Sequence, residues 1–179
     1  MRQLACTAFL AAAVLLFWHC GMVAQDRSAG LNLAYNEFSA MYQIPVGEKE
    51  SLRISANLDM TKVISGKVLY PGVSADAAYL FRIWGKRFLS GESMMFSAGP
   101  GACAGYVRDH RGHYGLMASL TGYIGFEYIF LVPVSISLSL EPCLGVHLNR
   151  DRFGYVNMDF YRYGLLYSLL PHVGIRYRF

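Results

Sequence analysis

Large apolar residues recur at every second position along most of the chain after residue 30. In the clearest stretch, Val134 to Leu148, they alternate with serine, glutamate, cysteine, glycine and histidine. The same period of two runs through Leu52 to Met60 and Leu116 to Phe130, and it holds one phase from Tyr163 to Phe179. Because successive side chains of a β-strand point to opposite faces, each stretch predicts a strand with one apolar face and one polar or small face.

Three further segments alternate less regularly: Val73 to Trp84, Ser93 to Val107 and Leu31 to Ile44. In the last of them the phase changes near Glu37, which predicts either a β-bulge or a two-residue turn at Asn36-Glu37. Short turns separate some segments, and longer stretches, richer in polar and aromatic residues, separate the others. The short turns are Pro45 to Lys49, Gly85 to Arg87 with Ser90 to Glu92, and Leu131 to Pro133; the longer stretches are Thr61 to Gly72, Arg108 to Gly115 and Asn149 to Arg162.

The first 24 residues have the layout of a secretory signal peptide. Met1-Arg2-Gln3 is a short positive start, Leu4 to Phe17 is apolar apart from Thr7, and Ala24 is a small residue before a predicted cleavage. The apolar core is shorter than the ~20 residues that a membrane-spanning helix needs. A lipoprotein cleaved at Cys20 is the competing interpretation, although bulky residues precede that cysteine. We therefore predict a signal peptide over residues 1–24 and one barrel domain over residues 25–179.

The composition narrows the class of protein. Hydrophobic residues make up 54% of the chain and charged residues only 16%, against about 25% charged in an ordinary soluble domain. This excludes a disordered protein, which needs low hydrophobicity and high charge, and makes an ordinary soluble enzyme a poor match. The net charge is +4 without any run of lysine or arginine, so no nucleic-acid partner is predicted.

The second face of the strands separates a soluble barrel from a membrane barrel. A lipocalin-like barrel turns its apolar face inward and would carry many lysines and glutamates outside. Here the second face is mostly serine, glycine, alanine and threonine with isolated charges, which suits the crowded lumen of a narrow barrel. Many segments are also long enough to span a bilayer, for which a tilted strand needs ~9–11 residues. The predicted fold class is an all-β, antiparallel up-and-down transmembrane barrel.

Aromatic residues gather at the ends of the segments, as in the two girdles at the interfaces of a membrane barrel. The alternative is a set of aromatics scattered through a core. One group lies beside the short turns or the C-terminus, namely Tyr42, Trp84, Phe88, Tyr128, Phe130, Tyr177 and Phe179. The other lies beside the longer stretches, namely Tyr70, Tyr106, Tyr114, Tyr155, Tyr161 and Tyr163.

The C-terminus carries the most specific motif. Val173, Ile175, Tyr177 and the terminal Phe179 resemble the C-terminal assembly signal of bacterial outer-membrane β-barrels. The mature chain as a whole is similar to small barrels of the OmpA and OmpX type, and its pattern also resembles barrel proteins of Bacteroidetes bacteria. The resemblance implies an outer-membrane location, recognition by the barrel-assembly machinery, contact with outer-membrane lipid and a periplasmic C-terminus. The short turns would then be periplasmic and the longer stretches extracellular.

Seven alternating segments are counted, whereas bacterial single-chain barrels have even strand numbers. We predict eight strands, with the eighth obtained by splitting Leu31 to Ile44 at Asn36-Glu37. The alternatives are a contribution from Tyr155 to Tyr161 or an extension of the first strand into Gln25 to Gly30.

Charged residues also fall on the lumen face of the predicted strands. Because lone buried charges are costly, they must pair inside a narrow barrel. The prediction is a polar plug with a structural or surface-interaction role, and a narrow pore or a small-ligand barrel is the alternative. The charges concerned are Arg53, Asp59, Asp76, Arg82, Glu127, Glu141, Arg176 and Arg178.

An enzyme that modifies lipid A is another alternative, because some small outer-membrane barrels acylate or deacylate this lipid. Such chemistry needs a serine activated by a histidine and an orienting carboxylate. His147 would be the base and Glu141 the carboxylate, but no His-x-Ser motif is present, and Ser168 could approach only through the fold. No catalytic residue is therefore assigned.

The remaining features predict no cofactor. His110 and His113 have a spacing that a metal could use, but no further ligands complete a site. Gly99-Pro100-Gly101 lacks the residues of a phosphate loop and is interpreted as a bend in a strand. Cys103 and Cys143 could pair or remain free thiols. The loops at Thr61 to Gly72 and Asn149 to Arg162 could meet a surface or membrane protein partner.

Overall fold

The protein folds into an all-β barrel in a computed structural model that describes residues 27–35, 37–60, 70–108, 113–150, 155–161 and 170–179. The predicted signal peptide lies outside these residues. The described residues contain no helix long and apolar enough to cross a membrane. The strands are β1 (Ser28–Leu33), β2 (Glu37–Pro45), β3 (Glu50–Asp59), β4 (Gly72–Arg87), β5 (Ser93–Arg108), β6 (Tyr114–Ile129), β7 (Val134–Leu140), β8 (Cys143–Arg150), β9 (Val156–Phe160) and β10 (His172–Arg178).

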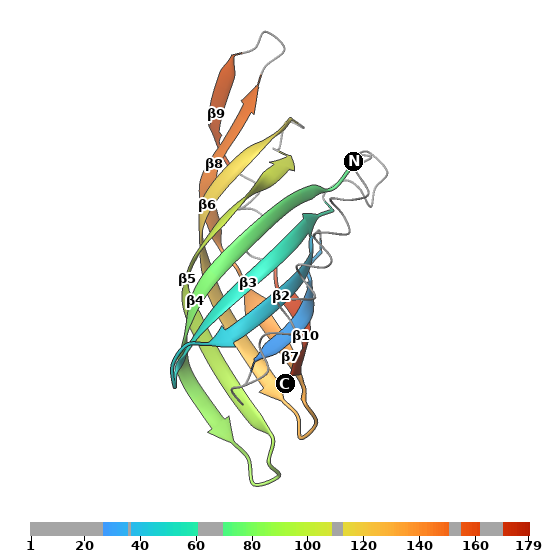
Figure 1. The fold of residues 1–179 in the computed structure, drawn as a ribbon, viewed down its shortest axis with the longest axis vertical. Helices are drawn as coiled ribbons and strands as arrows, with labels where there is room; N and C mark the ends of the chain where they lie inside the picture. Colours follow the sequence, from blue (N-terminus) through green and yellow to red (C-terminus); the bar gives the residue numbers. More distant parts are fainter. Residues whose placement is uncertain (1–26, 36, 61–69, 109–112, 151–154, 162–169) are drawn as a thin grey trace, which may run out of the picture.

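These ten segments make a closed barrel of eight antiparallel strands (Figure 1). β7 and β8 both pair with β6 and form one strand interrupted at Glu141-Pro142. β9 pairs with β8 and β10 with β7, so that these two segments form the last strand. The barrel closes where β10 pairs with β1. The predicted fold class, an all-β antiparallel barrel of eight strands, is therefore confirmed.

The split of Leu31 to Ile44 is also confirmed, since β1 and β2 pair as a hairpin with Leu33 opposite Phe38. Two boundaries were wrong. The stretch Asn149 to Arg162 was assigned to a loop, yet Val156–Phe160 is a strand because its alternating residues pair with the end of β8. The last strand was predicted to run without a break from Tyr163, whereas the described ladder of β10 begins at His172; residues 162–169 lie outside the described part.

The strands differ in length around the barrel. β4, β5 and β6 have 16 residues each, whereas β1 has six. The β4–β5 hairpin extends beyond the rest at the end where the C-terminus lies, and the β8–β9 hairpin extends beyond the rest at the opposite end (Figure 1). We refer to these as the lower and upper ends. The short turns between β2 and β3, β4 and β5, and β6 and β7 all lie at the lower end.

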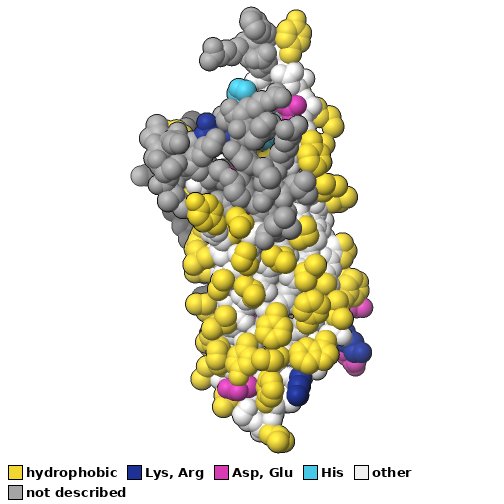
Figure 2. Space-filling view, turned by 180° about the vertical axis from the view of Figure 1, so that it is seen from behind, with side chains coloured by type: hydrophobic (Ala, Val, Ile, Leu, Met, Phe, Trp, Pro, Cys, Tyr) yellow, Lys and Arg dark blue, Asp and Glu magenta, His cyan; other side chains and the backbone are white. Residues whose placement is uncertain are grey.

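The two faces of the wall are sorted by polarity. Along β7, Ser135, Ser137 and Ser139 are buried in the interior, while Ile136 and Leu138 between them are exposed on the outside. Arg53, Arg176 and His147 are among the most deeply buried side chains of the described residues. Figure 2 shows hydrophobic side chains over the outer wall, with charged ones gathered near the ends. The apolar face of the predicted strands therefore points outward.

Most of the predicted aromatic positions lie on the outer surface near the two ends. At the lower end the Tyr42 ring lies 6.2 Å from that of Phe179, and at the upper end Tyr106 stacks on Tyr114 at 5.9 Å. Tyr161 is the exception among the described residues. It is 8% exposed and packs with Val107 and Met117 inside the barrel, so its assignment to an outer girdle was wrong.

Candidate functional site

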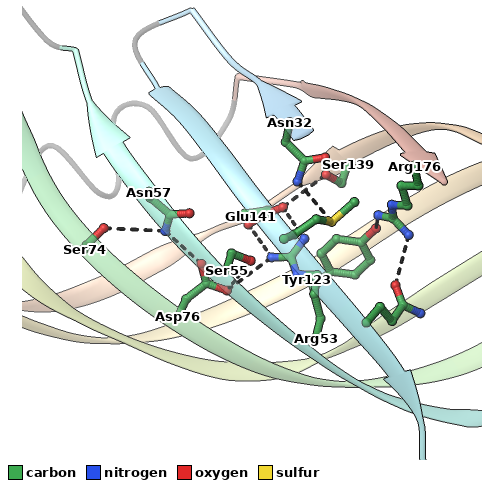
Figure 3. A network of polar contacts seen from close by, with 12 residues as sticks. Asn32, Arg53, Ser55, Asn57, Ser74, Asp76, Tyr123, Ser139, Glu141 and Arg176 are labelled. Carbon is green, nitrogen blue, oxygen red and sulfur yellow. Dashed lines mark hydrogen bonds and ion pairs between the residues drawn. The ribbon is translucent and has the colours of Figure 1, made fainter. Parts of the chain in front are cut away.

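The interior of the barrel is organised around Arg53, which β3 points into the lumen. Its guanidinium donates two hydrogen bonds of 2.6 Å to Glu141, one to each carboxylate oxygen, and a longer one of 3.5 Å to Asp76 (Figure 3). Glu141 lies in the interruption between β7 and β8. This two-pronged geometry is the strongest form of an arginine–carboxylate contact.

Neutral donors complete the hydrogen bonding of both carboxylates (Figure 3). Asp76 accepts from Asn57 at 2.8 Å and from the Ser55 hydroxyl at 3.2 Å, and Ser139 donates to Glu141 at 3.2 Å. These donors come from β3 and β7, on different sides of the lumen. Buried charges are tolerated only when they are paired and hydrogen-bonded, so these donors lower the cost of burying the cluster.

A second ion pair lies nearer the lower end of the lumen. Arg176 of β10 donates to Glu127 of β6 at 2.9 Å and to the side-chain oxygen of Gln43 at 3.0 Å. The Ser135 hydroxyl donates to the other oxygen of Glu127. Arg176 is 2% exposed. Its side chain connects β10 with β6 and β2 inside the barrel.

Tyr123 joins the two clusters. Its hydroxyl accepts a hydrogen bond of 3.0 Å from Arg176, and the guanidinium of Arg53 lies 4.4 Å from the centre of its ring. Gly125, two residues along the same face of β6, makes room for this ring, because a Cβ atom there would collide with the Tyr123 hydroxyl. The Tyr123 side chain therefore contacts both buried arginines, one through its hydroxyl and the other through its ring.

The predicted lumen charges are distributed unevenly. Five of them form the two clusters: Arg53, Asp76, Glu127, Glu141 and Arg176. The other three lie outside the clusters, with Asp59 half-buried near the upper end and Arg82 exposed and Arg178 half-buried at the lower end. Tyr123 and Gln43 were missed as members of the network, although Tyr123 shares its phase with Gly125 and Glu127, and this signal was available in the sequence.

His147 does not meet the partners that an acyl-transfer site would need. It is fully buried, its Nε2 donates to the Val107 carbonyl at 3.0 Å, and its ring stacks on Tyr161 at 6.1 Å. Glu141, its proposed carboxylate, is engaged by Arg53. Within the described residues no serine hydroxyl bonds to His147, and Ser168 lies outside them.

The cysteines and the candidate metal-binding histidines form no chemical site among the described residues. Cys103 and Cys143 are free thiols that pack against the cluster of Val107, Met117 and Tyr161. The part of the chain that the structure describes contains no group of three or more histidine, cysteine, aspartate or glutamate side chains placed to hold a metal. His113 is within that part, whereas His110 is not.

Gly99-Pro100-Gly101 lies inside β5, where all three residues pair with β6. On the β4 side, Gly101 pairs with Ala78 and Ala98 pairs with Phe81. The register therefore passes over Gly99 and Pro100 on β5 and Tyr79 and Leu80 on β4. A proline has no N–H to give to a ladder, so the motif is an irregularity within a strand and not a ligand-binding loop.

The four residues of the C-terminal motif lie on one side of the wall. Val173, Ile175, Tyr177 and Phe179 are all at least half exposed on the outer surface. The alternate residues His172 and Arg176 are buried inside. The Phe179 amide donates to the Arg27 carbonyl at 3.0 Å, which joins the two ends of the described barrel domain.

No protein-family model, curated protein or solved structure matches this chain.

Proposed function

We propose that this protein is a small integral barrel of a bacterial outer membrane, with a plugged polar lumen and a structural or surface-interaction role. The observation that carries the proposal is the inverted burial, with arginine, glutamate and serine inside and leucine, isoleucine and valine outside. A water-soluble protein rarely exposes a contiguous apolar area larger than a few hundred Å². Every described strand exposes at least one large apolar or aromatic side chain, and a wall of this kind fits a hydrocarbon environment.

The plug is supported by contacts that cross the lumen. Arg53 reaches from β3 to Glu141 beside β7, and Arg176 reaches from β10 to Glu127 and to Gln43 on β2. In a barrel of eight strands the interior is just wide enough for side chains to fill it. These contacts favour a closed interior over a conducting pore, and the described residues offer no observation that favours an acyltransferase or a hydrolase.

A surface-interaction role is supported by the β8–β9 hairpin, which rises beyond the rest of the barrel at the upper end (Figure 1). Its side chains Tyr155, Val156 and Met158 are exposed. Exposed apolar residues on a projecting element are typical of surfaces that meet another molecule. If the C-terminal motif acts as an assembly signal, this hairpin faces the outside of the cell.

Fractionation of cells that express the full chain tests the location. We expect the protein in the outer-membrane fraction after a carbonate wash, with a gel mobility that changes on heating. Recovery in the soluble periplasmic fraction would overturn the proposal.

The plug is tested in liposomes that contain the purified protein. Wild-type protein should admit no sugar-sized solute, whereas the double variant Arg53→Ala/Glu141→Ala, which removes the central contact, should increase uptake. Rapid uptake by the wild type would show that the lumen conducts.

A further inference from the structure

The lower mouth of the barrel contains a cavity that the polar network does not use. Two adjoining hollows, each of about 580 Å³, share Lys49, Arg82, Met95 and Arg178 in their walls. The β4–β5 hairpin, which extends beyond the rest of the barrel (Figure 1), contributes Arg82 to Arg87 and Ser93 to Met95 to the walls of the second hollow. The space lies below the buried clusters, because Gln43 lines the first hollow and also accepts a hydrogen bond from Arg176.

An irregularity in β4 determines which residues face this space. Arg82 is opposite Ser97 and Trp84 is opposite Phe96, so Ile83 is an extra residue between two regular pairs. Directly opposed residues share a face of the sheet. The extra residue therefore shifts the phase, and Arg87, opposite Ser93, returns to the face of Ser97 and Arg82. Without it, alternation along β4 would put Arg82 and Arg87 on opposite faces.

Cationic side chains outnumber carboxylates in the walls of the cavity. Five cations and no carboxylate line the second hollow: Lys49, Arg82, Lys86, Arg87 and Arg178. Glu48 and Glu50 line only the first hollow. Glu50 accepts a hydrogen bond of 2.7 Å from Tyr79, and Glu92 on the nearby turn accepts one of 2.5 Å from Tyr128. Such a concentration of positive charge repels itself and attracts anions.

We propose that this basic vestibule binds a phosphate-bearing ligand through Lys49, Arg82, Arg87 and Arg178. Lys86 is opposite Met94 and therefore lies on the other face of β4. Guanidinium groups offer forked donors that match the geometry of phosphate oxygens. Ser51, Ser97 and Ser93 line the two hollows and add neutral hydroxyl donors. The ligand binds at the mouth and does not pass through, because Arg176 and Gln43 close the space above it.

Two sources could supply the phosphate. A soluble phosphorylated compound would enter from the open mouth, whereas a phospholipid headgroup would enter from the side, where Ile83, Trp84 and Ile129 line the second hollow. The binding chemistry does not depend on the membrane location proposed above. Only the side of the membrane on which the vestibule opens depends on it.

The test uses the purified, folded protein in uncharged detergent at constant ionic strength. Calorimetry with pyrophosphate probes the soluble source, and native mass spectrometry with phosphatidylglycerol against uncharged diacylglycerol probes the headgroup. The vestibule variant is Arg82→Gln/Arg87→Gln. The matched control is Arg150→Gln, which removes one exposed arginine at the upper end. Heat-dependent gel mobility verifies that each variant is folded.

We expect binding of at least one probe by the wild type and the control, and a loss of about tenfold or more in affinity, ~1.4 kcal/mol, in the vestibule variant. Pyrophosphate binding identifies a soluble ligand, and retention of phosphatidylglycerol alone identifies a lipid headgroup. Equal affinity in wild type and vestibule variant, or an equal loss in the control, would overturn the proposal. Failure of the wild type to bind either probe would also overturn it, and none of these outcomes bears on the membrane location.

Discussion

Arg53 and Glu141 face each other through two parallel hydrogen bonds of 2.6 Å, although 88 positions separate them along the chain. The arginine comes from a regular strand and the glutamate from the break between β7 and β8. The break thus supplies the partner of a lumen cation that is only 2% exposed.

Removing one side of this pair should destabilise the barrel. In Arg53→Gln, Glu141 and Asp76 lose the buried cation that compensates them, and a buried pair broken in this way costs about 3–5 kcal/mol. The free energy of unfolding in urea, followed by the heat-dependent mobility shift, measures the loss. Arg150→Gln should change little, because Arg150 is exposed. In the double variant Arg53→Met/Glu141→Leu stability should partly return. Unchanged stability of Arg53→Gln would show that the pair is dispensable.

Gly125→Ala should disturb the position of Tyr123 and, through it, both arginines. The added methyl group would occupy the place of the Tyr123 hydroxyl, and forcing extra volume into a packed interior costs about 1–3 kcal/mol. Gly85→Ala is the control in another strand, since a Cβ atom there would lie 3.5 Å from its nearest neighbour, the Met94 carbonyl oxygen. Urea unfolding of the two variants should separate them clearly. Equal urea midpoints for the two variants would mean that the Tyr123 ring can move without loss of stability.

Leu120→Arg tests which solvent the outer wall meets. Leu120 is 72% exposed and lies near the middle of β6. At the centre of a bilayer an arginine on the lipid face costs about 2–4 kcal/mol, so refolding into lipid vesicles should be strongly impaired. Val46→Arg, in an exposed turn at the lower end, should refold normally. If both variants refold equally well, the middle of the wall does not face hydrocarbon.

Deleting Phe179 should reduce assembly in cells more than folding in detergent. Its ring lies on the outer surface, with contacts to Tyr42 and Tyr177, so its loss removes little from the interior. The fraction of heat-modifiable protein in the outer membrane measures assembly, and refolding of the purified variant measures intrinsic stability. Val132→Ala, another exposed apolar residue at the lower end, is the control. Normal assembly without Phe179 would refute its role as a signal.

The wall of the barrel could be predicted from local pattern. Alternation of apolar and small residues depends only on the geometry of a strand, so it located most strands and assigned Ser135, Ser137 and Ser139 to the inner face. The boundaries of the last strand could not be predicted in this way. Val156–Phe160 alternates over only five residues, and its pairing with β8 identifies it as a strand.

The interior could be predicted only in part. The phase of Arg53, Asp76 and Glu141 indicated that these charges enter the lumen and must be neutralised. It did not indicate their partners, because the choice depends on how the sheet curves and on which side chains are long enough to meet. Arg176 and Glu127 come from strands that are not neighbours in the sheet order, and the role of Tyr123 depends on the space that Gly125 leaves.

The separation of Arg53 from Glu141 along the chain has a consequence for biogenesis. While the chain is still an open sheet, Arg53 can reach Asp76 on the neighbouring strand β4, whereas Glu141 has no cation within reach and must keep its hydration shell. Water can leave the lumen only after β3 and the β7–β8 junction have been brought face to face. Drying of the interior is therefore a late event, coupled to the curling of the sheet, and Glu141 exchanges water for the Arg53 guanidinium only when the barrel closes.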